Sequence, residues 1–179
     1  MGQAFTVVIP AVLYLRIGTG SAIAAANNTT VDAINFTVPA ANIGDGTVIN
    51  ASAASGDLTN GAVTVRVFSN VGTNVTLNSS VTGQLSNGSG DTIPWSQIAV
   101  AAAALPTGTA GFTNGAITHP AFSSTTGAGT ATTLTAVSKL VRQEGRWTFS
   151  YSNASVVPAG TYGATVANNG RVTYTATQL

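Results

Sequence analysis

The chain has 179 residues, enough for one domain with a full core, and only 6% of them are charged, against about 25% in ordinary soluble domains. The formal net charge of +1 gives no long-range field that would attract nucleic acid or an acidic membrane, and the absence of cysteine excludes disulfides and thiolate metal sites. Thr, Ser, Asn and Gly supply the missing polarity, and because these residues disfavour helix interiors the composition predicts an all-β fold.

The first predicted element is the most strongly patterned in the chain. Every odd position from Phe5 to Ile17 is apolar, which puts one apolar face on an extended segment. Pro10 interrupts the segment because proline cannot donate to a strand ladder. We therefore predict two extended pieces, residues 4–9 and 11–17, and divide the chain into an N-terminal extension at 1–10 and a β-sandwich domain at 11–179.

Further short strands are predicted along the rest of the chain, and none of the segments has a helical period. The candidates are residues 34–38, 48–49, 63–68, a strand starting at Val75, 93–100 with a bend at Pro94, 130–137 and 147–151. Residues 161–167 and 171–177 flank Asn168-Asn169-Gly170 and predict a C-terminal hairpin, since Asn-Gly favours a type I′ turn. The only helix-friendly stretch is 100–105, and the longest apolar run, 98–105, is far shorter than a membrane span. Many short strands with such turns predict a single antiparallel β-sandwich.

The residues needed for catalysis are few and scattered. Five acidic residues and one histidine are spread over the chain, and no nucleophile motif accompanies His119. We interpret His119, which precedes Pro120, as an exposed and inert loop residue. The loop Asn87–Asp91 and the turn around Asp45 have too few carboxylates for calcium, and we interpret both as ordinary turns. The sequence therefore predicts no enzyme activity, no metal site and no cofactor, with a hydrolase centred on His119 as the least supported alternative.

The remaining polar and aromatic candidates also have structural interpretations. Lys139, Arg142 and Arg146 surround Glu144 and are interpreted as a solvated turn leading into a strand. Trp147 alternates with aromatic residues and is predicted to face the core. Trp95 follows a proline and is the candidate for stacking on a sugar, which is the basis of an alternative function as a carbohydrate-binding or adhesive domain.

The alternating N-terminal strand has two interpretations. It is either the first strand of its own domain or a donor strand that fills a groove in another subunit, with ladder bonds supplying affinity and alternate side chains entering pockets. Such a head-to-tail contact does not close and builds a fibre. On this hypothesis the chain is a homopolymer whose subunit interface contains Phe5, Val7, Ile9, Leu13 and Leu15.

Two short segments resemble a known family. The alternating N-terminal strand, the turn Val157-Pro158-Ala159-Gly160-Thr161-Tyr162 and the closing strand at 171–176 are similar to those of secreted bacterial β-sandwich fibre subunits, the spore-coat-U-like and archaic chaperone–usher pilins. This chain would be a cysteine-free variant. The resemblance implies a structural pilin of an extracellular fimbria on the cell surface, with copies of itself as partners. A glycan or another surface as a further partner, and a viral or tail-like assembly protein, stay as alternatives.

Overall fold

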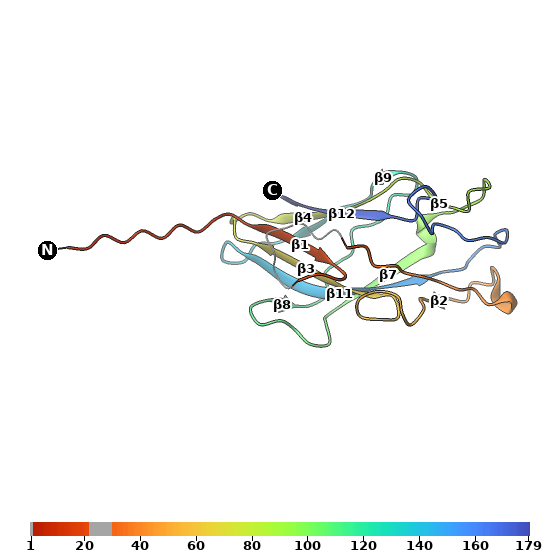
Figure 1. The fold of residues 1–179 in the computed structure, drawn as a ribbon, viewed down its shortest axis with the longest axis horizontal. Helices are drawn as coiled ribbons and strands as arrows, with labels where there is room; N and C mark the ends of the chain where they lie inside the picture. The colour runs from red at the N-terminus through yellow and green to blue at the C-terminus, as the bar shows by residue number, and fades with distance from the viewer. Residues whose placement is uncertain (1, 22–29) are drawn as a thin grey trace.

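A computed structural model describes residues 2–21 and 30–179, and it shows two antiparallel sheets packed face to face as a β-sandwich (Figure 1). The all-β prediction is thereby confirmed. The strands are β1 (Leu13–Ile17), β2 (Ile49–Asn50), β3 (Ala62–Ser69), β4 (Val75–Val81), β5 (Leu85–Ser86), β6 (Thr92–Ile93), β7 (Ile98–Ala103), β8 (Thr113–Asn114), β9 (Gly127–Ala128), β10 (Thr132–Leu134), β11 (Val141–Tyr151) and β12 (Val172–Gln178). Two short 3₁₀ helices, η1 (Ala40–Asn42) and η2 (Trp95–Gln97), accompany them.

The strands of the described residues form a large sheet, a small sheet and a separate pair. The large sheet has the order β1-β3-β11-β2, and β7 and β8 also pair with β11. The small sheet has the order β10-β4-β12, and β9 also pairs with β4, while β5 pairs with β6. All these pairs are antiparallel except the short β8–β11 pair.

The core lies between the two sheets and is built from alternate residues of the long strands. In β3 and β11 the odd-numbered side chains point inward, and they meet the inward face of β4. The fully buried members include Val65, Val67, Val75 and Trp147. Trp147 donates a hydrogen bond from Nε1 to the carbonyl oxygen of Ile117 at 2.6 Å, so its only polar group is satisfied within the core, where the pattern predicts this ring.

An ion pair is buried on the outer face of the large sheet. Arg66 of β3 and Glu144 of β11 lie opposite each other, with Arg66 Nη2 2.8 Å from Glu144 Oε2. The loop before β8 covers them: the Thr109 amide donates to Glu144 Oε1, and the Arg66 guanidinium lies 4.9 Å from the centre of the Phe112 ring. The interpretation of Glu144 as part of a solvated turn is therefore wrong, because its partner is an arginine 78 positions away in the chain.

One other prediction needs correction. The helix-friendly stretch at 100–105 forms no helix: residues 100–103 belong to β7, because pairing with β11 overrides the helix propensity of alanine. The predicted C-terminal hairpin is wrong, since β12 pairs with β4 and residues 161–167 form no strand. A turn does occupy residues 166–169, but it is not the predicted type I′ turn: Asn169 has a positive φ of 59° and Gly170 does not, and the Gly170 amide donates to the carbonyl oxygen of Thr165.

The edge of the large sheet continues beyond the end of β1 in residues 31–38. Gly18, at φ 75°, ends β1, and the Asp32 carboxylate accepts hydrogen bonds from the amide and hydroxyl of Thr19 at 2.6 and 2.7 Å. Residues 31–38 then run extended, with Ile34, Phe36 and Val38 turned inward. The sequence predicts a strand here, and the structure differs, because this segment makes no regular ladder.

The N-terminal residues form a straight arm outside the sandwich. Residues 2–10 project from one end of the body along its long axis, and η1 lies at the opposite end (Figure 1). The direction of β1 is away from the arm, while β12 runs toward it, so that the C-terminus lies near the base of the arm. We call residues 2–10 the tail.

Candidate functional site

The tail is an apolar segment that its own domain does not cover. Phe5, Val7 and Ile9 are 85%, 83% and 78% exposed, and none of the residues from 2 to 12 is part of a strand in the structure. Exposure of three large apolar side chains in one short segment costs free energy in water, of order 1.5–3 kcal/mol for each side chain left unburied. The predicted extended piece at 4–9 is thus exposed and outside the sheets, whereas of the predicted piece at 11–17 only Leu13–Ile17 forms β1.

A large groove opens between the two sheets. It has a volume of about 980 Å³, at the upper end of the range for small-molecule pockets, and its surface is mainly apolar. One wall is formed by residues 30–38 and the other by residues 157–166 and 170–174. The floor contains side chains from the large sheet, from the β5–β6 pair and from connecting segments: Val63, Leu85, Ile93, Trp95, Ile98, Phe122, Phe149 and Tyr151.

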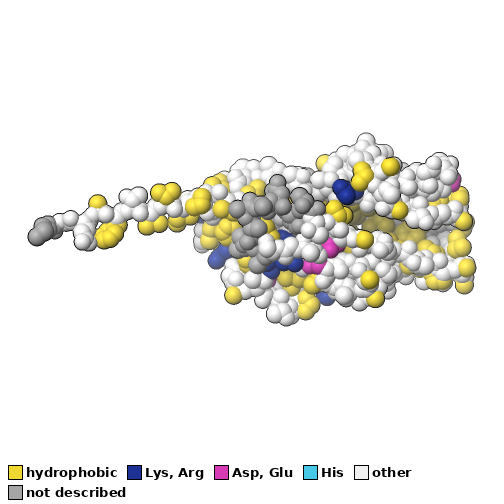
Figure 2. Space-filling model, viewed as in Figure 1, with side chains coloured by type: hydrophobic (Ala, Val, Ile, Leu, Met, Phe, Trp, Pro, Cys, Tyr) yellow, Lys and Arg dark blue, Asp and Glu magenta, His cyan; other side chains and the backbone are white. Residues whose placement is uncertain are grey.

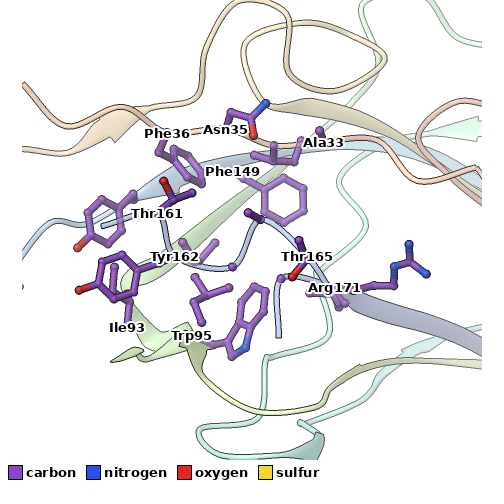
Figure 3. A pocket seen from close by; sticks show the side chains of 18 of the residues that line it. Ala33, Asn35, Phe36, Ile93, Trp95, Phe149, Thr161, Tyr162, Thr165 and Arg171 are labelled. Atoms are coloured by element: carbon purple, nitrogen blue, oxygen red, sulfur yellow. The ribbon is translucent and has the colours of Figure 1, made fainter. Parts of the chain in front are cut away.

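The groove occupies the half of the sandwich away from the tail. Figure 2 shows a hollow with a hydrophobic floor between two mostly polar lobes, at the end of the body opposite the projecting tail. At the other end of the groove its lining includes Leu15 and Ile17 of β1. Figure 3 shows the rings of Phe36, Phe149, Trp95 and Tyr162 turned into the pocket from different elements, while the Arg171 side chain points away from it. Interiors of folded domains are close-packed, so a groove of this size with large apolar side chains in its lining leaves apolar surface that the described chain does not cover.

Both walls of the groove have backbone edges without ladder partners. In the wall at 30–38, Ala33 and Asn35 bond outward, to the amides of Gly56 and Ser52 at 3.2 and 2.8 Å. The intervening Ile34 and Phe36 have their backbone groups on the other edge, and among the described residues no hydrogen bond reaches them. On the opposite wall β12 pairs with β4 on one side and with no described strand on the other. An extended peptide placed between these edges would find both apolar pockets and free backbone donors and acceptors.

An aromatic cluster built around His119 supports the floor of the groove. The His119 ring lies 4.5 Å from Trp147, 4.6 Å from Phe122 and 5.6 Å from Tyr174, measured between ring centres. His119 Nε2 and the Tyr174 hydroxyl are 2.8 Å apart and hydrogen-bonded. Burial lowers the pKa of His119 to about 4, so the ring is neutral at ordinary pH. The prediction of an exposed loop histidine is therefore wrong, and His119 joins the two sheets.

Trp95, the candidate for sugar stacking, lies inside the structure. Its side chain is only 6% exposed, its ring centre is 5.0 Å from that of Phe122, and Nε1 donates to the carbonyl oxygen of Gly83 at 2.7 Å. The indole therefore contributes to the groove and offers no flat exposed face to a glycan.

The acidic loops hold their carboxylates in local turns. Asn87 Nδ2 donates to Asp91 Oδ2 at 2.8 Å, and Asn42 Nδ2 donates to Asp45 Oδ2 at 2.9 Å. The hydrogen bond from Asn42, followed by that from the Thr47 amide, lowers the pKa of the Asp45 carboxyl below its usual value. Within residues 2–21 and 30–179, no group of three His, Asp or Glu side chains is placed to hold a metal ion.

The structure divides the five predicted interface residues into two sets. Phe5, Val7 and Ile9 are together in the exposed tail, whereas Leu13 and Leu15 are half-buried in β1 and pack against the core of their own chain. Leu15 also lines the groove. The groove itself is not evident from the sequence. The alternation of Ile34, Phe36 and Val38 is its only local signal, and the opposite wall begins about 120 positions later, at Val157.

No protein-family model, curated protein or solved structure matches this chain significantly. Across the described part of the chain, no helix has the length and apolar character needed to cross a membrane.

Proposed function

We propose that the chain is a structural subunit of an extracellular bacterial surface filament, assembled when the tail of one copy fills the groove of the next. The observation that carries the proposal is that a single chain has both an exposed apolar segment and an unfilled apolar groove with free backbone edges. Each feature is unfavourable in isolation, and insertion of one into the other removes both.

The dimensions and chemistry of the two features are compatible. At about 3.3 Å per residue an extended segment from 2 to 10 reaches roughly 30 Å, which is the scale of a strand in a sandwich. Alternation would place Phe5, Val7 and Ile9 in the groove and leave Thr6 outside. Burial of these three side chains would contribute several kcal/mol per junction, from which the costs of association and of ordering the tail are subtracted.

The positions of the tail and the groove support a linear polymer. The tail leaves one end of the body and the hollow lies toward the other, so each copy can donate at one end and accept at the other (Figures 1 and 2). A contact between two different surfaces does not close on itself unless the rotation per subunit makes a ring. The low charge of the chain suits an assembled state, because little repulsion has to be overcome between copies.

The first experiment removes the donor. We expect a chain without residues 1–9 to stay monomeric in size-exclusion chromatography and to form no filaments in negative-stain electron micrographs, while the full chain polymerises. Identical filaments from the shortened chain would show that the tail is not the donor.

A matched pair of substitutions separates burial of the tail from a general effect of charge. Val7→Asp places a carboxylate on the face that should enter the groove, and Thr6→Asp places the same charge on the opposite face. Since burial of an unpaired carboxylate is strongly unfavourable, we expect Val7→Asp to abolish assembly and Thr6→Asp to retain it. Equal effects of the two substitutions would contradict a one-sided insertion.

The carbohydrate-binding alternative predicts a different result. A glycan-binding domain should retain a specific signal on a glycan array after Val7→Asp, because its ligand would not depend on the tail. Filaments that depend on Val7, without any array signal, would support the structural function.

A further inference from the structure

Asn70 lies at the point where the ladder between β1 and β3 ends. The last paired residues are Leu13 and Ser69, and the Asn70 amide adds one more backbone bond, to the carbonyl oxygen of Val12 at 3.3 Å. The chain then turns away from β1 through Gly72, which has a φ of 92°. From this point β3 has no further backbone with which to hold the preceding residues of the N-terminal segment.

The side chain of Asn70 replaces the missing backbone. The Val12 amide donates to Asn70 Oδ1 at 2.7 Å, and Asn70 Nδ2 donates to the carbonyl oxygen of Pro10 at 2.8 Å. A primary amide offers the same donor and acceptor as a peptide group. Residues 10 and 12 present their backbone groups on the same edge of an extended chain, so a single side-chain amide can bond to both. Asn70 thus extends the ladder to the base of the tail.

The residues that precede Pro10 in the chain are exposed. Residues 2–9 are all exposed, and Pro10 has no N–H, so its carbonyl group is the only hydrogen-bonding group of its backbone. Among the described residues, the bond from the Asn70 side chain to Pro10 is therefore the last hydrogen bond between the body and the tail.

We infer that Asn70 is the positioning residue of the donor tail, which it directs along the axis of β1 and away from the groove of its own chain. This inference rests on the proposed function, because it gives the tail a task only if the tail is donated. Insertion into the chain's own groove would require a reversal of direction between residues 10 and 12, and both bonds would break. A segment already held in its bound direction also loses less conformational freedom on insertion, which favours binding to another copy.

The test uses the full chain, in which a cysteine introduced at Thr6→Cys is the only thiol and carries a spin label. We expect Asn70→Ala to increase the mobility of this label and to slow filament growth about tenfold, the effect of losing two ordinary hydrogen bonds. Asn70→Asp keeps the acceptor for Val12 but loses the donor to Pro10, so an intermediate effect is expected. Asn74→Ala is the matched control, because Asn74 lies on the same connection and its Oδ1 accepts a bond from Ala136 and not from the tail.

A third measurement separates positioning from damage to the body. In a Val7→Asp background, which cannot donate, a synthetic peptide of residues 2–11 should bind with the same affinity whether position 70 is Asn or Ala. Unchanged filament growth in Asn70→Ala, or a loss of peptide affinity equal to the loss in growth rate, would overturn the inference. If the parent chain forms no filaments at all, the proposed function fails, and an unchanged label mobility in Asn70→Ala would then show that Asn70 does not hold the tail either.

Discussion

His119 is enclosed by aromatic rings that come from both sheets. Trp147 belongs to β11 and Tyr174 to β12, and Phe122 lies on the connecting segment that also packs against Trp95. A charged imidazolium in this cluster would have only the Tyr174 hydroxyl as a polar partner among the described contacts. Protonation should therefore loosen the packing between the sheets below the groove.

The first prediction concerns the pH dependence of folding. The His119 pKa is lowered from 6.5 to about 4 in the folded chain, so the unfolded chain binds a proton at a higher pH than the folded chain does. Stability should be complete above pH 6.5, fall by at most about 1.4 kcal/mol per pH unit toward pH 4, and lose nothing more through this residue below that value. Urea unfolding of the Val7→Asp chain at a series of pH values measures this slope.

The control replaces the titrating ring. His119→Gln cannot take up a proton and can still reach the Tyr174 hydroxyl, so its stability between pH 6.5 and 4 should be flatter than that of the parent by the histidine contribution. Equal slopes in both chains would mean that carboxylates account for the whole pH dependence.

At the residue scale, the sequence predicted side chains whose surroundings are local. The position of Trp147 follows from the alternation of its own strand, and that prediction is confirmed by its full burial. The surroundings of His119 and Glu144 could not be predicted in the same way. Their partners, Tyr174 and Arg66, lie 55 and 78 positions away and are brought close only by the pairing of strands.

The groove is an element-scale feature, because one of its walls is the irregular segment 30–38 and the other is residues 157–166 together with the start of β12. A strand in this position would have β12 on one side and the backbone of Ile34 and Phe36 on the other. It would bridge the sheets along one open side of the sandwich. The stability of an isolated subunit should therefore increase when any suitable strand is supplied.

The second prediction is that the tail peptide stabilises a subunit that cannot donate. A peptide of residues 2–11 at a concentration of 100 times its Kd should raise the unfolding free energy of the Val7→Asp chain by about 2.7 kcal/mol. The peptide with Val7→Asp should have no effect at the same concentration, because its charge would enter the apolar groove. Thermal or urea unfolding with increasing peptide measures the effect, and identical stabilisation by both peptides would exclude side-specific insertion.

Strand prediction succeeded where an alternating segment pairs with a neighbouring strand, and it failed where such a segment has no regular strand partner. The patterns at 63–68 and 147–151 correspond to β3 and to the end of β11, which pair along most of their length. Residues 34–38 have the same alternation without becoming a strand, because this segment makes only isolated backbone bonds, such as that from the Ser52 amide to the carbonyl oxygen of Asn35, and no regular ladder. A turn was predicted at Asn168-Asn169-Gly170 and a turn is present there, but it is not of type I′, and residues 161–167 bond elsewhere: the Gly163 amide donates to the carbonyl oxygen of Ser86 in β5. Local turn chemistry does not determine which strands pair.

At the scale of the whole molecule, the donor and the acceptor lie toward opposite ends. A filament made of such units has a free tail at one end and an empty groove at the other, so it is polar. A subunit that accepts but cannot donate can be added only once to each filament, and growth beyond it is impossible in that direction.

The third prediction follows from this polarity. Addition of the Val7→Asp chain to a polymerising solution should shorten the filaments in proportion to its mole fraction, because each copy that receives a tail ends that filament. Filament lengths in electron micrographs measure the effect. The Thr6→Asp chain should be incorporated without shortening, and equal lengths in the two mixtures would contradict termination by a copy that cannot donate its tail.

The two bonds of Asn70 to the base of the tail have a consequence for dilute solutions. A copy whose tail is directed outward cannot fill its own groove, so the groove stays empty until the copy meets another one. Below a threshold concentration such copies would remain single, and above it added protein would enter polymer while the level of free subunit stays constant. The affinity of one junction would set that threshold. The Asn70 side-chain amide at the base of the tail would therefore influence how much protein must accumulate before a fibre appears.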